Sequence, residues 1–424
     1  MALYWLAMRS IVTFGFIVLL LTPFARSEQL CSQTDLQTAI QRVKAIQSQL
    51  LAYKIQDEID EGVPAPLQAQ IRIFKESLAA LADAALSCAK EDTNPKLIES
   101  TLTKLLDANK PATIEGYDPK KPPQFDQIYG DGIDVKVTAS AIAPKVLLVD
   151  IHFGIECGYD SMLLVYELQS SHWQQVLRWQ SGNYDLINGA FGDFFAYQLV
   201  QQSGSKNWNL AVAHGHPWCT SRWSAFDLDL IEPLRETGLP QVIFHKHVGY
   251  VRDTDPVMKA IPDGIQIRVE TGSLDMSLMT RPAIYRYRVS GNQIDRVQPI
   301  AMNGRDFVDE WLQSEWSESK NWSSSSGLIE LEAAYKKIKN IRNSDINTNE
   351  NPNFTYGPVR DCSDSPSHFQ VELDQGWWVE AQKDWRPDKP TYFQIQEGKN
   401  SFTMLSALDK PDPRCTGRDI MPKH

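Results

Sequence analysis

The sequence has 424 residues, 42% of them hydrophobic and 22% charged, which is ordinary for a folded protein of two or three domains. Its formal net charge is −11, from 53 acidic residues against 42 lysines and arginines. An acidic surface repels phosphate backbones and anionic lipid, so we expect neither a nucleic acid partner nor electrostatic docking on a membrane.

The N-terminus is typical of a secretory signal. Residues 11–24 are an apolar run that follows Arg9, and residues 25–27 place small side chains at the two positions that decide cleavage. At 1.5 Å per residue the run covers about 21 Å, short of the roughly 30 Å hydrocarbon core of a bilayer. We therefore expect residues 1–27 to be a cleaved signal peptide. The mature chain would be secreted or periplasmic and would have no integral membrane span.

Six cysteines follow this segment, and an even number in an exported chain favours disulfide bonds. None of them forms a CxxC motif or a zinc-like cluster. They fall into three pairs along the chain, and six buried free thiols are the alternative. We predict the disulfides Cys31–Cys88, Cys157–Cys219 and Cys362–Cys415.

Residues 28–110 carry the pattern of an antiparallel helical hairpin. Within residues 67–88, apolar and small residues recur at alternating spacings of four and three, and residues 36–53 carry a second apolar stripe. Residues 62–66 contain Gly and two Pro, which break the helix between them, and a third short helix begins at residue 94. The hairpin either packs on the body of the protein or protrudes as an arm for a partner.

A Pro-rich linker, residues 111–125, precedes a change to two-residue periodicity. Residues 126–304 alternate between short apolar strands and turn signals, which predicts an antiparallel β domain, either propeller-like or made of layered sheets. The predicted strands are 134–139, 145–153, 162–168, 173–180, 194–200, 207–214, 224–231, 241–250, 264–270, 283–289 and 293–299.

Residues 305–355 are predicted to connect this domain to a C-terminal β unit, residues 356–424. The connection contains two stretches with the apolar spacing of a helix, the first capped by Asp306. It ends in a polar Asn-rich loop over 343–353. The C-terminal strands are predicted at 367–373, 377–381, 391–396 and 402–408. The fold class is therefore α+β, with an N-terminal helical hairpin, a mainly antiparallel β body and a short helical insertion.

Two His-x-His pairs, His214 with His216 and His245 with His247, contain half of the eight histidines. Because residues i and i+2 of a strand point to the same face, each pair presents two imidazoles side by side. Three or four such ligands from neighbouring strands would suit zinc, and a water bound at an open position would ionise near pH 7 and support hydrolysis.

Asp150 and His152 repeat this spacing with a carboxylate and are further candidate ligands. The competing interpretation is that the histidines are hydrogen-bonded side chains of ordinary strands, because Leu210 and Val212 share the face of His214.

Asp227 and Asp229 also lie two apart on a predicted strand, and paired carboxylates are the catalytic groups of glycosidases. Tryptophans would offer stacking surfaces for a sugar, although Trp at strand spacing is expected in the core. Those tryptophans are Trp218, Trp223, Trp377 and Trp378. No nucleophile elbow and no nucleotide-binding glycine motif occurs in the sequence.

Two functions of different classes follow. The first is an exported, non-enzymatic binding or assembly protein, with an unidentified protein or glycan partner and no cofactor. It is favoured because no catalytic motif is visible. The second is a metal-dependent hydrolase that holds zinc with the four paired histidines.

Overall fold

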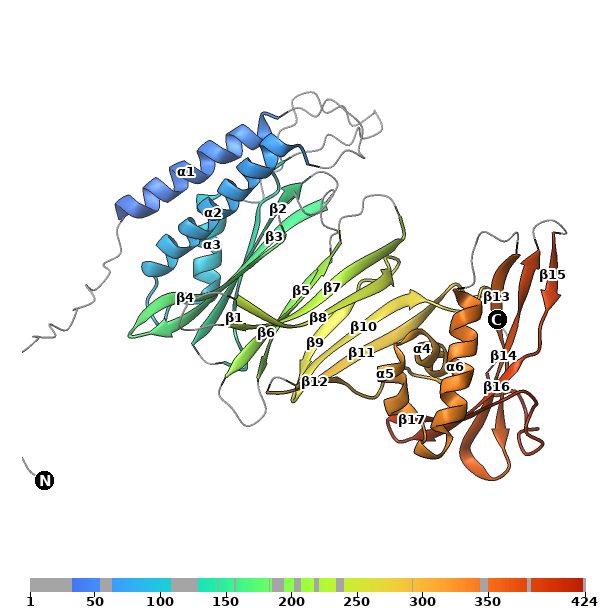
Figure 1. The fold of residues 1–424 in the computed structure, drawn as a ribbon. Helices are drawn as coiled ribbons and strands as arrows, with labels where there is room; N and C mark the ends of the chain where they lie inside the picture. Colours follow the sequence, from blue (N-terminus) through green and yellow to red (C-terminus); the bar gives the residue numbers. More distant parts are fainter. Residues whose placement is uncertain are drawn as a thin grey trace, which may run out of the picture.

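The computed structural model shows an α+β fold, with helices at the N-terminal end and several antiparallel sheets behind them, as the sequence predicts (Figure 1). Among the described residues no helix is long and apolar enough to cross a membrane. The signal segment and the Pro-rich linker lie outside the described residues. The structure describes residues 33–53, 63–107, 129–143, 145–155, 158–182, 184, 194–201, 207–216, 221–233, 240–291, 293–343, 350–379 and 383–421.

The N-terminal hairpin consists of α1 (Gln33–Leu51) and α2 (Ala65–Ser87), and α3 (Pro95–Leu105) follows it. The Asn94 side chain caps α3 by accepting a hydrogen bond of 2.9 Å from the Lys96 amide. The apolar seam of α2 is buried, and it packs together with α1 and α3 on one face of the first sheet. The hairpin is therefore docked on the β body and does not protrude.

The described strands form four antiparallel sheets, here named A, B, C and D. Sheets A, B and C each have four strands in chain order, so neighbours in sequence are neighbours in space. Sheet A contains β1 (Asp134–Ala139), β2 (Val146–Ile155), β3 (Gly158–Gln169) and β4 (His172–Gln180). Sheet B contains β5 (Phe195–Gln201), β6 (Trp208–Gly215), β7 (Trp223–Pro233) and β8 (Pro240–Val251). Sheet C contains β9 (Val257–Ile261), β10 (Gly264–Gly272), β11 (Thr280–Ser290) and β12 (Gln293–Arg296).

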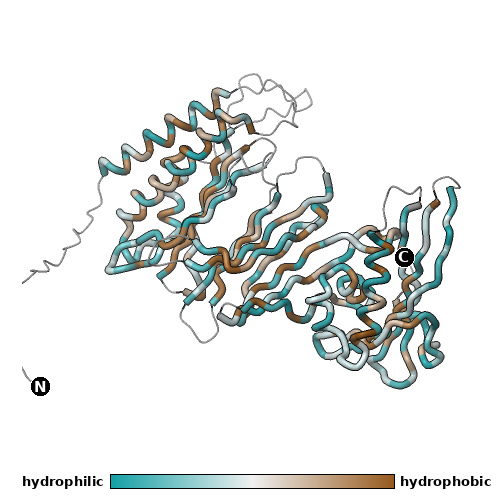
Figure 2. The backbone as a smooth tube through the Cα atoms, viewed as in Figure 1, coloured by the Kyte–Doolittle hydropathy of each residue, from teal (hydrophilic) through white to brown (hydrophobic). Residues whose placement is uncertain are grey.

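Sheets A and B, and then B and C, pack face to face, so this part of the protein is a row of layers (Figures 1 and 2). Sheet B is covered on both faces, and β6 shows this directly. Leu210 and Val212 enter the core shared with sheet A, whereas Ala211 and Ala213 enter the core shared with sheet C. Burial on both sides explains why the sequence of β6 is almost continuously apolar.

Sheet D contains β13 (Glu350–Cys362), β14 (Ser365–Val379), β15 (Asp384–Pro387), β16 (Thr391–Gly398) and β17 (Ser401–Leu408). It shares one core with α4 (Gly304–Gln313) and α6 (Leu328–Arg342). The helix α5 (Trp316–Ser319) and the 3₁₀ turns η1 (Lys320–Trp322) and η2 (Ser325–Gly327) connect these two helices.

Several predictions for this half of the chain are wrong in detail. Asn303, and not Asp306, caps α4, because its side chain accepts from the Asp306 amide at 2.9 Å. Residues 350–353 belong to β13, where pairing with β14 holds them in extended form. The two strands predicted within 367–381 are one strand, β14. The strands β9 and β15 were not predicted.

The predicted Cys362–Cys415 disulfide is confirmed, with an S–S distance of 2.01 Å. Cys88 is also disulfide-bonded. Cys31, Cys157 and Cys219 lie outside the described residues, so the other two predicted pairings stay predictions.

Candidate metal centre

The two His-x-His pairs lie on either side of β7 in sheet B, with His214 in β6, His216 directly after its end, and His245 and His247 in β8. In the strand register His214 of β6 is opposite Asp227 of β7, which is opposite His247 of β8. Two residues further along β7, Asp229 is opposite His245 of β8. Alternation along each strand then places all four histidines and both aspartates on one face, the face that packs on sheet A.

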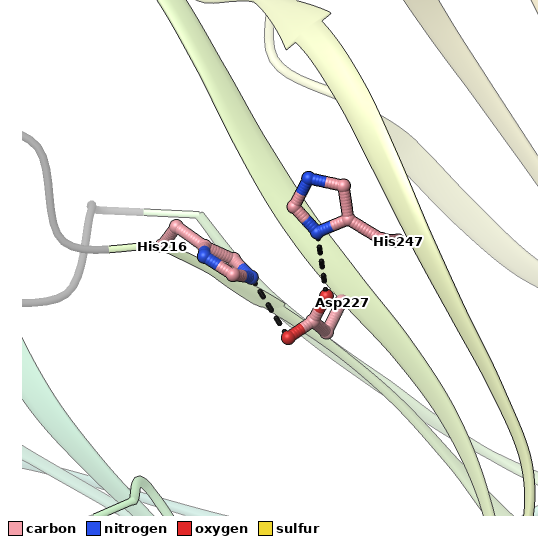
Figure 3. A group of neighbouring side chains, drawn as sticks. All are labelled: His216, Asp227 and His247. Carbon is pink, nitrogen blue, oxygen red and sulfur yellow. Dashed lines mark hydrogen bonds and ion pairs between the residues drawn. The ribbon is translucent and has the colours of Figure 1, made fainter. Parts of the chain in front are cut away.

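The first rung of this face comprises His216, Asp227 and His247 (Figure 3). The Asp227 carboxylate lies between the two imidazoles: His216 Nε2 is 2.7 Å from Oδ2, and His247 Nδ1 is 2.9 Å from Oδ1. One donor atom from each residue lies within 4.8 Å of the others. Side chains from β7, from β8 and from the residue directly after β6 thus lie close together.

The second rung comprises His214, Asp229 and His245. His245 Nδ1 is 2.8 Å from Asp229 Oδ1, and His214 Nε2 is 3.4 Å from Asp229 Oδ2. The other ring nitrogen of His245, Nε2, lies 3.9 Å from Oδ1 of Asp227, so this imidazole stands between the two carboxylates.

Exposure increases from the centre of the cluster to its margin. The Asp227 side chain is 16% exposed, whereas those of His216 and His247 are 39% and 57% exposed. Burial alone would raise the pKa of Asp227, but hydrogen bonds from His216 and His247 lower it well below its ordinary value. The hydrogen bond with Asp229 raises the pKa of His245. The cluster therefore favours the ionised form of the Asp227 carboxylate.

The structure does not bring Asp150 and His152 into either rung. They lie on β2 of sheet A, where His152 Nε2 is 2.7 Å from Asp150 Oδ1. The Phe195 and Trp179 rings lie between them and the rungs. Phe195 contacts both His152 and Trp179 with centroids 5.1 Å apart, and Trp179 contacts His214 at the same distance.

The other ring nitrogen of His152, Nδ1, is hydrogen-bonded at 2.8 Å to the Ser161 hydroxyl, so Ser161, His152 and Asp150 lie in sequence, although the His152–Asp150 contact is an ion-pair distance and not a hydrogen bond. These are the residue types of a hydrolase triad. Ser161 is only 6% exposed, however, and its hydroxyl points into the layer between sheets A and B, where a substrate carbonyl has no access. These three residues therefore contribute to the packing of the sheets and not to acyl transfer.

The other candidate groups give weaker support for a functional site. Cys362, Asp364 and His368 lie close together, but the Cys362 sulfur is occupied by its disulfide. Asp227 and Asp229 stand side by side on one strand and do not face each other across a cleft, as glycosidase carboxylates do. The expectation that the tryptophans are core residues is wrong for Trp223 and Trp378, which are exposed. Trp218 lies outside the described residues.

The donor atoms of the first rung are of the types that zinc binds, but their present distances are not those of zinc ligands. Zinc binds imidazole nitrogen and carboxylate oxygen at 2.0 to 2.2 Å, so two ligands at a tetrahedral angle are about 3.3 Å apart. The present nitrogen–oxygen distances of 2.7 and 2.9 Å are those of hydrogen bonds. The two imidazoles face different oxygens of the Asp227 carboxylate, so the side chains must shift before all three residues can hold one ion.

Sequence reasoning identified the four histidines but did not assign the two aspartates to their site. The signal that could have assigned them is the spacing that the three pairs share. An Asp-x-Asp pair follows the first His-x-His pair and precedes the second. In an antiparallel meander that spacing aligns the three pairs on one face.

No protein family model matches this chain, and no curated protein matches it. What the centre does must follow from its donor atoms, which are four imidazoles and two carboxylates on three adjacent strands.

Proposed function

We propose that this chain is an exported metal-binding protein whose first rung holds a zinc ion. The observation that carries the proposal is the convergence of Asp227 in β7, His247 in β8 and His216 directly after β6, with one donor atom each within 4.8 Å. Export is supported by the Cys362–Cys415 disulfide, because such bonds persist in oxidising compartments.

The donor set favours zinc over the hard cations. Calcium and magnesium select sites made of oxygen ligands, whereas imidazole nitrogens with a carboxylate suit zinc and its first-row neighbours. The His216 and His247 side chains are partly exposed, so an ion from solvent reaches the rung without opening the sheet. Strand pairing on both sides of β7 fixes the backbone that carries the ligands.

Elemental analysis tests this proposal. The full-length protein is equilibrated with zinc, freed of excess ion by gel filtration, and compared with the variants His216→Ala and His247→Ala. We expect bound zinc in the wild type and a loss of bound zinc in both variants. His172→Ala is the matched control, because His172 is an exposed strand histidine far from the rungs. A folded wild-type protein without zinc, or equal zinc in all four proteins, would refute the proposal.

A second candidate function, metal-dependent hydrolysis, is favoured by one observation. The first rung supplies three protein ligands at a partly exposed position, and a zinc ion held by three ligands keeps a position for water. Zinc-loaded protein is assayed with p-nitrophenyl acetate and bis(p-nitrophenyl) phosphate. Turnover that disappears in His216→Ala would support an enzyme. Equal rates in wild type and variant would leave metal binding without catalysis.

A further inference from the structure

We propose that the second rung binds a second zinc ion, so that one face of sheet B holds two ions per chain. This inference rests on the proposed function of the first rung. It arises because the second rung repeats the donor set of the first: a β7 carboxylate between one imidazole from β6 and one from β8. The members are His214, Asp229 and His245.

The geometry of the second rung also repeats that of the first. In each, the β8 imidazole uses Nδ1 to contact Oδ1 of the aspartate, and the β6 imidazole uses Nε2 to contact Oδ2. A shift of two residues along each strand converts one rung into the other. That shift corresponds to about 7 Å, because a strand rises by about 3.3 to 3.4 Å per residue.

One ion cannot use all of these ligands. Zinc takes four ligands in a tetrahedral site, whereas the two rungs supply six side chains. Donor atoms on one ion are at most about 4.2 Å apart, which is less than the backbone spacing of about 7 Å between the rungs, although His245 Nε2 lies 3.9 Å from Asp227 Oδ1. An ion held by the first rung therefore does not use the donor atoms of His214 and Asp229.

The two rungs differ in how closely their donor atoms already approach the arrangement that binds an ion. The three donors of the first rung lie within 4.8 Å of one another, whereas those of the second rung do not, and there the contact between His214 and Asp229 is 3.4 Å and His214 packs on Trp179. His245 lies between the carboxylates, with Nδ1 toward Asp229 and Nε2 toward Asp227. We expect the first rung to fill first, and the second to fill at higher zinc concentration because two dications so close repel each other.

The test compares histidines two residues apart on the same strand. Metal-free full-length protein is titrated with zinc against a chromogenic chelator, and the zinc content is then measured after gel filtration. We expect two ions in the wild type, one in His214→Ala, one in His216→Ala and none in the double variant. Asp229→Asn, which keeps the side-chain volume, is a second variant of the second rung and is expected to bind one ion.

The outcomes separate this inference from the proposed function. Wild type with one ion that His214→Ala and Asp229→Asn retain would overturn the second site and keep the first. Two ions in both second-rung variants would also overturn it, because the second ion would then lie elsewhere. Wild type with no ion would refute both proposals together.

Discussion

Oδ2 of Asp227 lies 2.7 Å from Nε2 of His216 on the neighbouring chain segment, and this contact holds together the first rung of sheet B. The His216 amide donates to the Ala225 carbonyl at 2.8 Å, so the backbone pairing continues beyond the end of β6 and fixes the imidazole beside the carboxylate. If the first rung binds zinc as proposed, we expect the ion to replace this direct contact between the imidazole and the carboxylate.

Replacing Asp227 with Asn tests the role of this carboxylate. The amide keeps the size of the side chain but removes its charge, so we expect zinc affinity to fall by at least about tenfold, the lower end of what is lost when even an outer-shell partner is removed. Isothermal titration with zinc measures the change. Asp263→Asn is the control, because Asp263 is a surface carboxylate paired with Arg288 on another sheet. Equal affinity in both variants would remove Asp227 from the site.

The buried pair of Lys75 and Asp160 should be essential for docking the hairpin on sheet A. The Lys75 and Asp160 side chains are 2% and 0% exposed and lie 3.1 Å apart, and Lys75 also donates to the Ser181 carbonyl. Lys75→Met leaves a buried carboxylate without its cation, so we expect a loss of about 3 to 5 kcal/mol in the free energy of unfolding.

Urea unfolding followed by fluorescence measures this loss. The control is Lys44→Met, because the Lys44–Asp107 pair is half exposed and a surface pair contributes about 0 to 1 kcal/mol. A similar small change in both variants would show that the Lys75 pair does not hold the hairpin.

Stability near neutral pH should rise when Asp306 is replaced by Asn. Burial raises the pKa of Asp306 to about 6, so the folded state holds a proton that the unfolded state has already lost at that pH. The stability that this group contributes is present at low pH and is lost as pH rises from about 4 through 6. We expect Asp306→Asn to be more stable by up to about 3 kcal/mol at pH 7.5 and by little at pH 4.

Thermal unfolding of both proteins between pH 4 and pH 8 checks this difference. The Asn side chain can still accept from the Asn303 amide group, which donates to Asp306 at 2.5 Å. A stability gain that does not depend on pH would show that burial of the charge is not its cause.

Glu310 should make the protein sensitive to acid. Burial alone would raise its pKa, but Arg296 and Arg281 hold the pKa at about 2. Arg281 Nη2 lies 2.6 Å from Glu310 Oε2, and Arg296 contacts the other oxygen. The contribution of this group is complete above about pH 5 and is lost as pH falls toward 2. It amounts to about 3 kcal/mol for a shift from the ordinary value of 4.5.

Glu310→Gln should therefore unfold more easily at pH 7 and show a smaller loss of stability between pH 5 and pH 3 than the wild type. Glu330→Gln is the control, because Glu330 lies in the first turn of α6, outside this network. Parallel pH profiles for wild type and Glu310→Gln would contradict the assignment.

Much of the local structure follows from the sequence because it depends on neighbours in the chain. The strand predicted at residues 134–139 matches β1, and the start predicted at residue 94 matches the cap of α3. Where the local signal is weak, prediction fails. The strand β9 lies at the edge of sheet C with no fully buried side chain, so its residues show no apolar alternation.

The start of β13 was predicted as a loop for a related reason. Asn351, Pro352 and Asn353 have low strand propensity, and their extended form comes from pairing with Trp378, Trp377 and Gly376 of β14. Such pairing joins residues that are distant in sequence, so a local pattern does not report it.

The sequence by itself determined that each His-x-His pair presents two imidazoles on one face of a strand, because alternation is a property of the extended backbone. Only the tertiary structure decided that β7 lies between those strands and carries Asp227 and Asp229 into both rungs. It also decided that Asp150 and His152 lie on another sheet, separated from the rungs by Phe195 and Trp179. The reason is that strand order and sheet stacking arise from contacts between distant segments, and the spacing of residues along one strand does not contain them.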